Sequence, residues 1–497
     1  MDFTQIGIIF ALFLMLIIGL YAGRKVNGKL ENYFVAGRKL AAPVVALALV
    51  GQAIDGNSTM ANTGLASEFG LWAGAVLPIG LAISLLFLGR FFAKPLHEMK
   101  LLTLADFFRQ KYDRKIEFIA SIILLIGFGF LLAGNLASIA LLLEIIFHVQ
   151  YGTLVIALSL FVLAYIILGG IISDILTDTL QVGFFVVAVA LACGFLLFSN
   201  SGLGAFASEK GLSLISVTQL LNPAEGALVN WATIVALGLG NILAIDFVTR
   251  ILSARSPEAA KNGCYLAAGG TMLFALPFSF FAIYAADSGI SAVEGIPFFV
   301  TFAVQTFPPI INFMLLAAIV SIALSTIDGA MLSMGNIFMR NVLDIKEGSG
   351  SEDAMLYYAR ISILPITAAA MLFALLFPNP GIMLTVAFDV LFASCLVPFV
   401  APFFVKRPSI NAALAAIIAG GVVRIVFAVL TPTTFGVENT FFYLENTFIT
   451  AEMDGLGTII SPMVSLAAFA FVTWRENTKK VTGNRLLSGL QKLFDFS

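Results

Sequence analysis

Apolar segments long enough to cross a lipid bilayer recur along most of the chain. A helix needs roughly 20 apolar residues to span about 30 Å of hydrocarbon. Spans are predicted at 4–23, 41–66, 71–97, 115–147, 151–170, 176–199, 229–250, 262–286, 309–341, 356–378, 380–404, 409–431 and 457–475. Apolar residues make up 60% of the 497 residues and charged residues only 11%. The sequence therefore predicts an all-α polytopic membrane protein with about 13 transmembrane helices, forming one transmembrane domain over residues 1–497.

One span contains a polar, glycine-bearing stretch at 51–64, GQAIDGNSTMANTG. Lipid cannot hydrogen-bond a free backbone, so such a stretch is tolerated at membrane depth only where it lines a cavity or a bound ion. Asp55 lies in its middle, and an intramembrane carboxylate is costly unless it has a partner or a function. Because the apolar run 41–50 is too short to span alone, we expect a broken helix at a binding site. The alternative is an ordinary loop between two short spans.

Basic residues are distributed unequally between the loops. The loop after the first span carries Arg24, Lys25, Lys29, Arg38 and Lys39. If that loop is inside, alternation also places inside the basic segments 98–114, 251–261, 342–355 and 405–408 and the tail after 475. The opposite segments, 200–228, 287–308 and 432–456, carry Lys210 as their only Lys or Arg. The positive-inside rule then predicts a plasma (bacterial inner) membrane protein with its N-terminus outside and its C-terminus in the cytoplasm.

Two of the outer segments are long enough to hold structure. The stretch 294–309 is predicted to form a short lid helix. The stretch 432–456, with four acids and several aromatic residues, is predicted to be an interfacial loop.

No residue pattern indicates an enzyme or a metal enzyme. The three cysteines, Cys193, Cys264 and Cys395, fall within apolar spans, and His97 and His148 lie far apart. We find no nucleophile–base arrangement and no phosphate-binding loop, and neither a nucleic acid nor an obligate protein partner is expected.

Five short blocks, in order along the chain, resemble signature blocks of the sodium:solute symporter family. They are ENYFVAGRK at 31–39, the polar stretch 51–64, GGIISDILTDTLQ at 169–181, RILSARSPEAAK at 250–261 and IALSTIDGAMLS at 322–333. The resemblance covers roughly residues 4–430. It implies the leucine-transporter fold, with an extra span at 4–23, inverted five-helix repeats at 41–199 and 229–404, and extra spans within 409–475. It also implies Na⁺-driven uptake of a small solute.

The resemblance further implies a site for the coupling ion. Na⁺ is a small hard cation, so its ligands should be oxygens, and transporters of this architecture use the carbonyl groups that a broken helix exposes. Carried onto matching positions, the ligands are the carbonyl groups of Ala53, Gly56 and Ile322 and the hydroxyl groups of Ser325 and Thr326. The alternative for the two hydroxyl groups is a hydrogen bond to their own helix.

Three further acids lie in the blocks 169–181 and 322–333. Asp178 matches the acid of the family's "TD" pair and is expected to draw the ion inward from behind its ligands. Its alternative role is that of an acid at a helix start, and we interpret Asp174 as such a cap. Asp328 lies three residues after Ser325, on nearly the same helical face, and would bind a cation or pair internally.

Candidate substrate contacts face the cavity expected between the repeats. On the two broken helices they are Gln52, Asp55, Asn57, Ser58 and Asn62, and Asn241, Asp246 and Phe247. Asn241 lies in LGLGNILAID at 237–246, at the place in the second repeat that corresponds to the first break. Paired interruptions of this kind indicate a binding site at the membrane midplane. Asp55 and Asp246 favour a positively charged solute, and their alternative is pairing with Na⁺ or with a gating arginine.

Within the family, further blocks are nearest to the high-affinity choline transporter-like branch. They are FFAKP at 91–95, FDVL at 388–391 and VPF at 397–399. A quaternary ammonium prefers an aromatic cage, yet the stretch 51–64 has no aromatic residue and Asp55 stands where that branch has a tryptophan. This departure disfavours choline and leaves amines, amino acids and polyamines open. Asp389 and Arg424, deep in late spans, are predicted to form a gating or structural pair.

The sequence as a whole predicts a Na⁺-coupled symporter for a small polar solute, amine-bearing or zwitterionic, that works by alternating access. One alternative is a proline, other amino-acid or carboxylate symporter. Another is a transporter-like sensor module with a separate signalling partner, which the absence of a kinase domain before Ser497 disfavours. A channel is disfavoured because paired broken helices fit alternating access better than a continuous polar pore.

Overall fold

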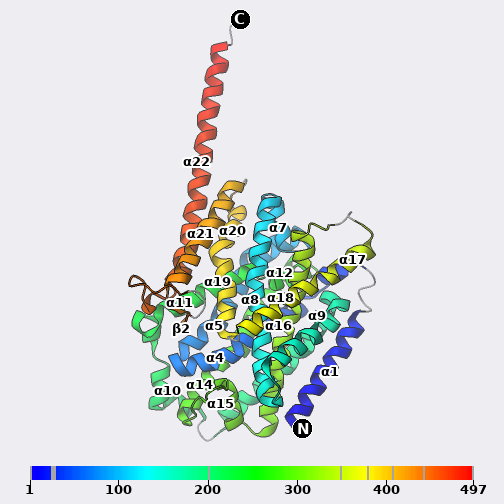
Figure 1. Cartoon of the computed structure of the whole chain (residues 1–497), viewed down its shortest axis with the longest axis vertical. Coiled ribbons are helices and arrows are strands. Elements are labelled where there is room, and N and C mark those ends of the chain that lie inside the picture. Colours follow the sequence, from blue (N-terminus) through cyan, green and yellow to red (C-terminus); the bar gives the residue numbers. More distant parts are fainter. Residues whose placement is uncertain are drawn as a thin grey trace.

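The computed structural model describes residues 3–23, 29–199, 202–346, 350–377, 380–405, 408–439 and 443–494. Their helices pack side by side in one bundle, with α1 along one edge (Figure 1). The basic positions Arg24, Lys25, Lys406 and Arg407 lie outside the described residues, and so do the side chains after residue 478.

Most of the described chain forms long apolar helices. By length and composition, nine helical runs within the described ranges can each cross a membrane, and two bent pairs raise the number to eleven. The nine are α1 (Phe3–Gly23), α5 with α6 (Leu71–Phe87, Ala93–Glu98), α8 (Arg114–Phe147), α9 (Tyr151–Leu197), α13 with α14 (Pro257–Ala275, Pro277–Asp287), α16 (Pro309–Ile337), α17 with α18 (Glu352–Ile361, Ile363–Leu376), α21 (Ile410–Leu430) and α22 (Leu456–Phe494). The bent pairs are α11 with α12 (Ala227–Val235, Ile245–Leu252) and α19 with α20 (Pro380–Ser394, Leu396–Phe404). The number thirteen stays a prediction.

Shorter elements connect these helices. They are α2 (Leu30–Val35), α3 (Ala42–Ala53), α4 (Gly56–Phe69), α7 (Ala105–Lys111), α10 (Glu209–Leu214) and α15 (Phe298–Thr306). Strands β1 (Thr433–Thr434) and β2 (Val437–Glu438) pair antiparallel in a small hairpin. The lid helix predicted at 294–309 is present as α15, and the predicted interfacial loop at 432–456 contains the hairpin.

Helix α9 is two helices joined at Gly170, whose φ of +53° requires a residue without a side chain. Tyr165 donates a hydrogen bond to Asp328 of α16, and Asp178 accepts one from Ser325 of the same helix. In a straight helix Tyr165 and Asp178 would lie about 20 Å apart, so the chain must turn back at Gly170. The sequence predicted separate spans at 151–170 and 176–199. That prediction was wrong only for residues 171–175, which it left between the spans. Because Gly170 makes the turn alone, the second helix begins directly after it.

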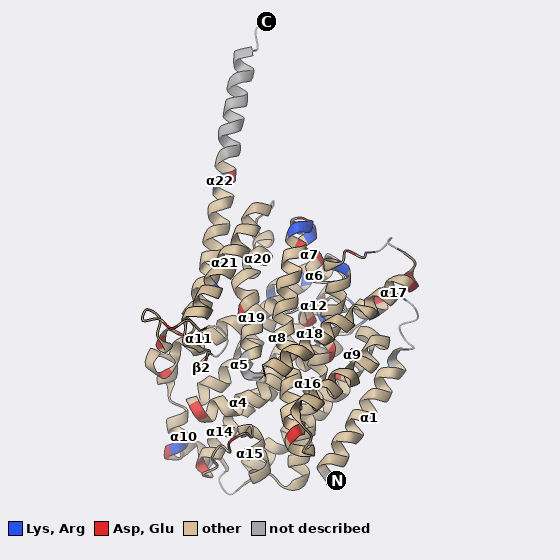
Figure 2. Ribbon diagram, viewed as in Figure 1, with Lys and Arg blue, Asp and Glu red and all other residues tan. Residues whose placement is uncertain are grey.

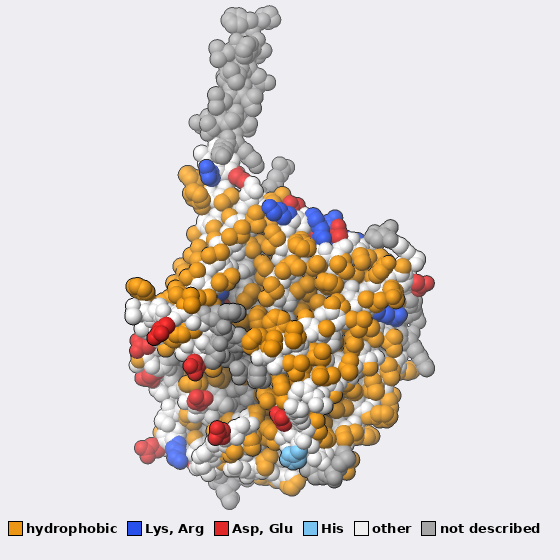
Figure 3. Space-filling model, viewed as in Figure 1, with side chains coloured by type: hydrophobic (Ala, Val, Ile, Leu, Met, Phe, Trp, Pro, Cys, Tyr) orange, Lys and Arg blue, Asp and Glu red, His pale blue; other side chains and the backbone are white. Residues whose placement is uncertain are grey.

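The surface fits a membrane. Apolar side chains cover most of the face seen in Figure 3. Well-exposed apolar residues of the chain include Leu160, Leu273 and Ile425. Lys and Arg gather at one end of the bundle, around α6 and α7 (Figure 2). A protein with this surface is stable only when lipid covers the apolar belt, so the chain is an integral membrane protein.

Helix α16 lies at the centre of the bundle and positions the candidate site. Every residue from Leu315 to Ile337 is buried. The helix packs against α8 and both halves of α9 on one side and against α3 and α4 on the other. Polar groups on α16 therefore meet other protein groups and not lipid.

Candidate functional site

The polar stretch at 51–64 breaks the first core helix as predicted. Helix α3 ends at Ala53, Ile54 and Asp55 have extended backbone, and α4 begins at Gly56. Asp55 caps α4: its Oδ1 accepts the amide of Ser58 at 2.7 Å, while its own amide donates to the Ser58 hydroxyl at 3.3 Å. This reciprocal capping box supplies partners for backbone groups that lipid would leave bare.

A second residue, Asn135 of α8, fixes the break from the side. Its Nδ2 donates to Asp55 Oδ2 at 3.0 Å, and its Oδ1 accepts the amide of Gly56 at 2.9 Å. Asn57 Nδ2 also donates to Asp55 Oδ2, at 3.2 Å. Asp55 was a predicted substrate contact, but each of its carboxylate oxygens already accepts a hydrogen bond within the protein. The sequence did not single out Asn135, since an isolated asparagine in an apolar span carries no local signal.

The predicted hydroxyl ligands of Na⁺ meet the broken helix at Gly51. The hydroxyl groups of Ser325 and Thr326 each lie 3.2 Å from the Gly51 carbonyl oxygen. In a continuous helix this oxygen would accept the amide of Asp55, which instead donates to Ser58. The break therefore leaves a carbonyl oxygen that the two hydroxyl groups share.

The other predicted ligands lie close by but are not all in contact with the hydroxyl groups. Gly56 packs against Ala323 and Ser138, its own carbonyl oxygen accepting from Thr59 at 3.3 Å. The Ile322 carbonyl oxygen lies 3.5 Å from the Thr326 hydroxyl, and no hydrogen bond within the described residues reaches the Ala53 carbonyl. Gly51 is thus a contact that the sequence analysis missed, two residues before the position it selected.

Buried charges surround this point. Arg250 of α12 pairs with Asp174 and, at 3.2 Å, with Asp178 of α9, and all three side chains are fully buried. Asp178 Oδ1 also accepts from the Ser325 hydroxyl at 2.5 Å, which places this acid next to a predicted ion ligand. The interpretation of Asp174 as a helix cap was wrong: the residue lies inside α9 and pairs with Arg250.

We call Asp174, Asp178, Asp246, Asp328 and Arg250 the deep cluster. It contains four carboxylates and one guanidinium group, none of them exposed by more than 1%. Asp328 Oδ1 accepts from Tyr165 at 2.5 Å, but Asp328 Oδ2 and Asp174 Oδ1 have no hydrogen-bond partner among the described residues. Carboxylates buried in excess of their cations require another cation or a proton.

The second break lies in the helix that runs from α11 to α12. A π-helical turn at Ala236–Gly240 and a 3₁₀ turn at Asn241–Leu243 end at Ala244, which is extended, and the two helices bend by 45°. Asn241 Nδ2 donates to the Leu237 carbonyl at 2.9 Å, while its Oδ1 has no partner in the described part of the chain. The predicted mirror of the first break is therefore present, with fewer of its polar groups satisfied.

Among the remaining substrate candidates, some side chains have hydrogen-bond partners for their polar atoms and others leave one polar atom without a partner in the described part of the chain. Asn62 accepts from Ser279 at 2.6 Å and faces α13 and α14, and Ser58 belongs to the capping box. Asp246 Oδ1 accepts the amide of Phe247 at 2.7 Å, and the Phe247 ring is buried. Gln52 donates to the Ser325 carbonyl at 2.8 Å but leaves its Oε1 without a partner among the described residues, as Asn57 does its Oδ1.

Asp389 of α19 and Arg424 of α21 form an ion pair, with the Asp389 side chain almost fully buried. Their sequence positions predicted this pairing. A role in gating stays a prediction.

A different group of charges ties together the basic end of the bundle (Figure 2). We call it the basic-face cluster: Asp106, Glu117 and Asp344 with Arg109, Arg114, Arg340 and Lys346. Glu117 is fully buried and accepts hydrogen bonds from Arg109, Arg114, Lys346 and Asn341. The cluster connects α7, the start of α8 and the end of α16, and the sequence analysis missed it because its members come from distant segments.

Comparison with known families identifies the family of this chain. The sodium:solute symporter family model matches residues 33–420, well over half of the chain. The chain belongs to the sodium:solute symporter family. It is therefore a membrane transporter and not an enzyme, and Na⁺ is its coupling ion.

Individual relatives are distant. The chain is 25% identical to the high-affinity choline transporter 1 of Drosophila melanogaster over 395 residues, which cover 75% of this chain and 62% of that transporter. It is 27% identical to the sodium/proline symporter of Haemophilus influenzae, with 83% and 85% covered.

Among solved structures, a Na⁺-coupled sialic acid symporter in a substrate-bound outward-open state matches with a TM-score of 0.75 at 17% identity. The match covers 94% of this chain and 96% of that one. This likeness establishes the leucine-transporter fold implied by the sequence blocks, and at such low identity it establishes nothing about the solute.

Proposed function

We propose that this symporter takes up a small amine-bearing or zwitterionic organic solute together with Na⁺, by alternating access. The observation that carries the proposal is the meeting of Ser325 and Thr326 with the freed carbonyl of Gly51 beside Asp178. Two hydroxyl groups, a carbonyl and a nearby carboxylate are the oxygen donors that a hard monovalent cation needs.

In this proposal Na⁺ binds between the first break and α16. Its ligands are the hydroxyl groups of Ser325 and Thr326 with carbonyl groups of the break and of Ile322. Gly51 is added to Ala53 and Gly56 as a residue whose carbonyl oxygen binds Na⁺, because the hydroxyl groups of Ser325 and Thr326 already contact this oxygen. Asp178 balances the charge of the ion from behind Ser325.

The charge of the deep cluster supports a cationic group on the solute. Four buried carboxylates against one guanidinium leave, when all are ionised, negative charge beyond what a single Na⁺ neutralises. Asp246 and the free Oδ1 of Asn241, both at the second break, are the proposed contacts for the solute nitrogen. The relatives are named for choline and for proline, solutes that each contain a positively charged nitrogen, which agrees with this class.

Alternating access follows from the paired breaks. In the proposed organisation, 41–199 and 229–404 are the inverted repeats, and each carries its break in its first helix. Na⁺ held against α16 stabilises the conformation open to the outside and so favours solute binding, a coupling typically worth about 1–3 kcal/mol. The basic end around α7 is proposed to face the cytoplasm, with the N-terminus outside.

The test is uptake by proteoliposomes that contain the full chain. A panel of labelled amines, amino acids, carboxylates and sugars is supplied with and without a Na⁺ gradient, and an amine or amino acid is expected to accumulate. For that solute, replacing Ser325→Ala and Thr326→Ala together should raise the Na⁺ concentration at half-maximal uptake about tenfold or more, because two of the ion's ligands are lost.

Ser321→Ala is the matched control. Ser321 is buried one turn earlier on α16 and donates only to the Ala317 carbonyl of its own helix, at 2.8 Å. Its replacement should leave the Na⁺ dependence unchanged. Unchanged Na⁺ dependence in the double variant would refute the ion site, and Na⁺-driven uptake of carboxylates or sugars alone would refute the solute class.

A further inference from the structure

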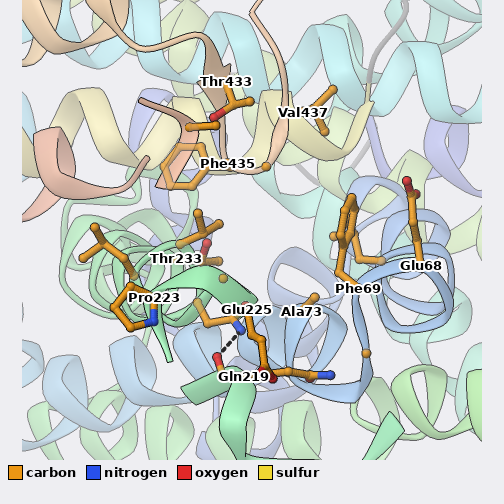
Figure 4. A pocket seen from close by; sticks show the side chains of 18 of the residues that line it. Glu68, Phe69, Ala73, Gln219, Pro223, Glu225, Thr233, Thr433, Phe435 and Val437 are labelled. Carbon is orange, nitrogen blue, oxygen red and sulfur yellow. Dashed lines mark hydrogen bonds between the residues drawn. The ribbon is translucent and has the colours of Figure 1, made fainter. Parts of the chain in front are cut away.

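One cavity in the described part of the molecule lies outside the deep cluster. It has a volume of about 740 Å³ and opens between the end of α4, the start of α5, α11, the segment 217–226 and the hairpin β1–β2. Figure 4 shows Glu68 and Phe69 on one side of it, Thr233 and Pro223 on another, and Phe435 and Thr433 of the hairpin above. Cavities of this size hold small organic ligands.

The cavity wall carries one sign of charge. Glu68, Glu225 and Glu452 line it, and no Lys, Arg or His is among its described lining residues. Hydrogen bonds from Thr218 and Asn222 lower the pKa of Glu225, so this carboxylate is ionised at neutral pH. A cavity with such a wall attracts cations and repels anions.

Aromatic and hydroxyl groups supply the remaining contacts. Phe69, 43% exposed, and Phe435 offer ring faces to a cation. Thr233 and Thr385 are 5% and 3% exposed and line the inner part of the cavity. Thr433 also lines the cavity, and its buried hydroxyl group has no hydrogen-bond partner within the described chain, which a polar ligand would supply. Gln219 adds a buried Oε1 that also lacks a partner there.

Two residues that line the cavity lie on the helices that carry the second break and Asp389. Thr385 lies one helical turn before Asp389 on α19, and Thr233 lies about 12 Å before Asn241 along the broken helix. A solute that moved from this cavity to the second break would therefore pass the glutamates first.

We propose that this cavity is a second binding site, specific for organic ammonium ions, that captures the solute before it reaches the site within the membrane. The glutamates hold the charge, the two phenylalanine rings cover the methyl or methylene groups around the nitrogen, and the threonine hydroxyl groups bind a polar substituent. The proposal rests on the proposed function for its solute class but requires no Na⁺.

The test measures binding of tetramethylammonium to the purified full chain in Na⁺-free, low-salt buffer by saturation-transfer NMR of its methyl protons. Saturable binding is expected, and neopentyl alcohol, an uncharged molecule of similar shape, should bind far more weakly. The triple variant Glu68→Gln, Glu225→Gln, Glu452→Gln should weaken tetramethylammonium binding about tenfold or more, because three attractive charges are lost.

A matched triple variant controls for net charge. Glu209→Gln, Glu294→Gln and Glu445→Gln remove three exposed acids that do not line the cavity, and binding should change by less than about twofold, since well-separated surface charges are screened. Equal binding by both triple variants, or equal binding of neopentyl alcohol, would overturn the proposal. If the first triple variant fails to fold, two other measurements test the proposal. Raising KCl from about 20 to about 500 mM must weaken binding of tetramethylammonium to the wild-type protein. The single variant Phe435→Leu must weaken this binding as well.

The proposed function and the proposed second site can be refuted independently of each other. Ser325→Ala with Thr326→Ala should raise the Na⁺ concentration at half-maximal uptake and keep tetramethylammonium binding. Glutamate-dependent binding without any Na⁺-driven amine uptake would refute the proposed function alone. Na⁺-driven amine uptake with no glutamate-dependent binding would refute the second site alone.

Discussion

The two ionic clusters of this transporter differ in how well their acids are matched by bases and hydrogen-bond donors. In the basic-face cluster, both carboxylate oxygens of Asp106 and of Glu117 accept hydrogen bonds, and acids and bases are nearly equal in number. In the deep cluster, four carboxylates share Arg250, and Asp174 and Asp328 each keep an oxygen with no partner among the described residues. In the described part of the chain, the protein itself supplies partners for the buried carboxylates Asp106 and Glu117 of the basic-face cluster, but not for every carboxylate oxygen of the deep cluster.

This difference indicates what each cluster does. A buried polar network in which every group has a partner stabilises one conformation. A network with excess carboxylates is costly in the protein alone and becomes favourable when a cation enters. The basic-face cluster therefore holds α7, α8 and α16 together, while the deep cluster is the part of the fold that a coupling cation completes.

The largest effect is expected at Arg250. Arg250→Ala leaves Asp174 and Asp178 buried without their only cation, so the free energy of unfolding should fall by about 3–5 kcal/mol. Denaturant unfolding of the detergent-solubilised protein measures it. Arg255→Ala removes a neighbouring but exposed arginine and should change stability by less than about 0.5 kcal/mol. Similar results for both variants would mean that Arg250 does not neutralise the deep cluster.

A matched pair of acids tests the contrast directly. Glu117→Gln removes the charge that four donors share in the basic-face cluster and should cost about 2–3 kcal/mol of stability. Asp328→Asn removes one charge from a cluster with too many, and its new amide can still accept from Tyr165. We expect its stability in Na⁺-free buffer to be unchanged or higher, within about 1 kcal/mol.

Uptake should separate the two variants in the opposite order. Asp328→Asn should impair Na⁺-dependent uptake, and Glu117→Gln should keep the Na⁺ concentration at half-maximal uptake once folded. If Asp328→Asn destabilised the protein as much as Glu117→Gln, the deep cluster would not be overcharged and the comparison would fail.

The sequence predicted one cluster far better than the other. Ser325, Thr326 and Asp178 were found because each lies in a short block with its own pattern, and the break at Asp55 was found because polar residues interrupt an apolar run. Asn135, Tyr165 and Arg250 were missed as partners. Their contacts join residues 72 to 163 positions apart, which only the tertiary fold brings together.

The same reason explains the errors of detail. Asp174 has the local sequence of a helix cap, and only the packing of α12 against α9 and α16 gives it Arg250 as a partner. The hydroxyl groups of Ser325 and Thr326 contact the carbonyl group of Gly51, which the sequence did not single out, because this contact depends on how α16 packs against α3. Ala53 and Gly56 stay predicted ligands. The basic-face cluster carries no sequence motif at all.

The smallest effect concerns pH at the basic-face cluster. Burial of Asp344 opposes the shift, but the hydrogen bond from Lys346 and the charges of Arg114 and Arg109 together lower its pKa below the ordinary value. A carboxylate whose pKa is lower in the folded state stabilises that state above the unfolded pKa, about 3.9, and the stabilisation is lost as pH falls through the folded value. Because the side chain is 42% exposed, water and salt screen these pairs.

Asp344→Asn should accordingly lower the free energy of unfolding by no more than about 0.5 kcal/mol near neutral pH. The difference from wild type should shrink below about pH 4 as Asp344 itself becomes protonated. Unfolding curves at both pH values measure it. A difference that stayed constant with pH would mean that Asp344 contributes through packing and not through its charge, and the basic-face cluster would then owe its stability to Asp106 and Glu117 alone.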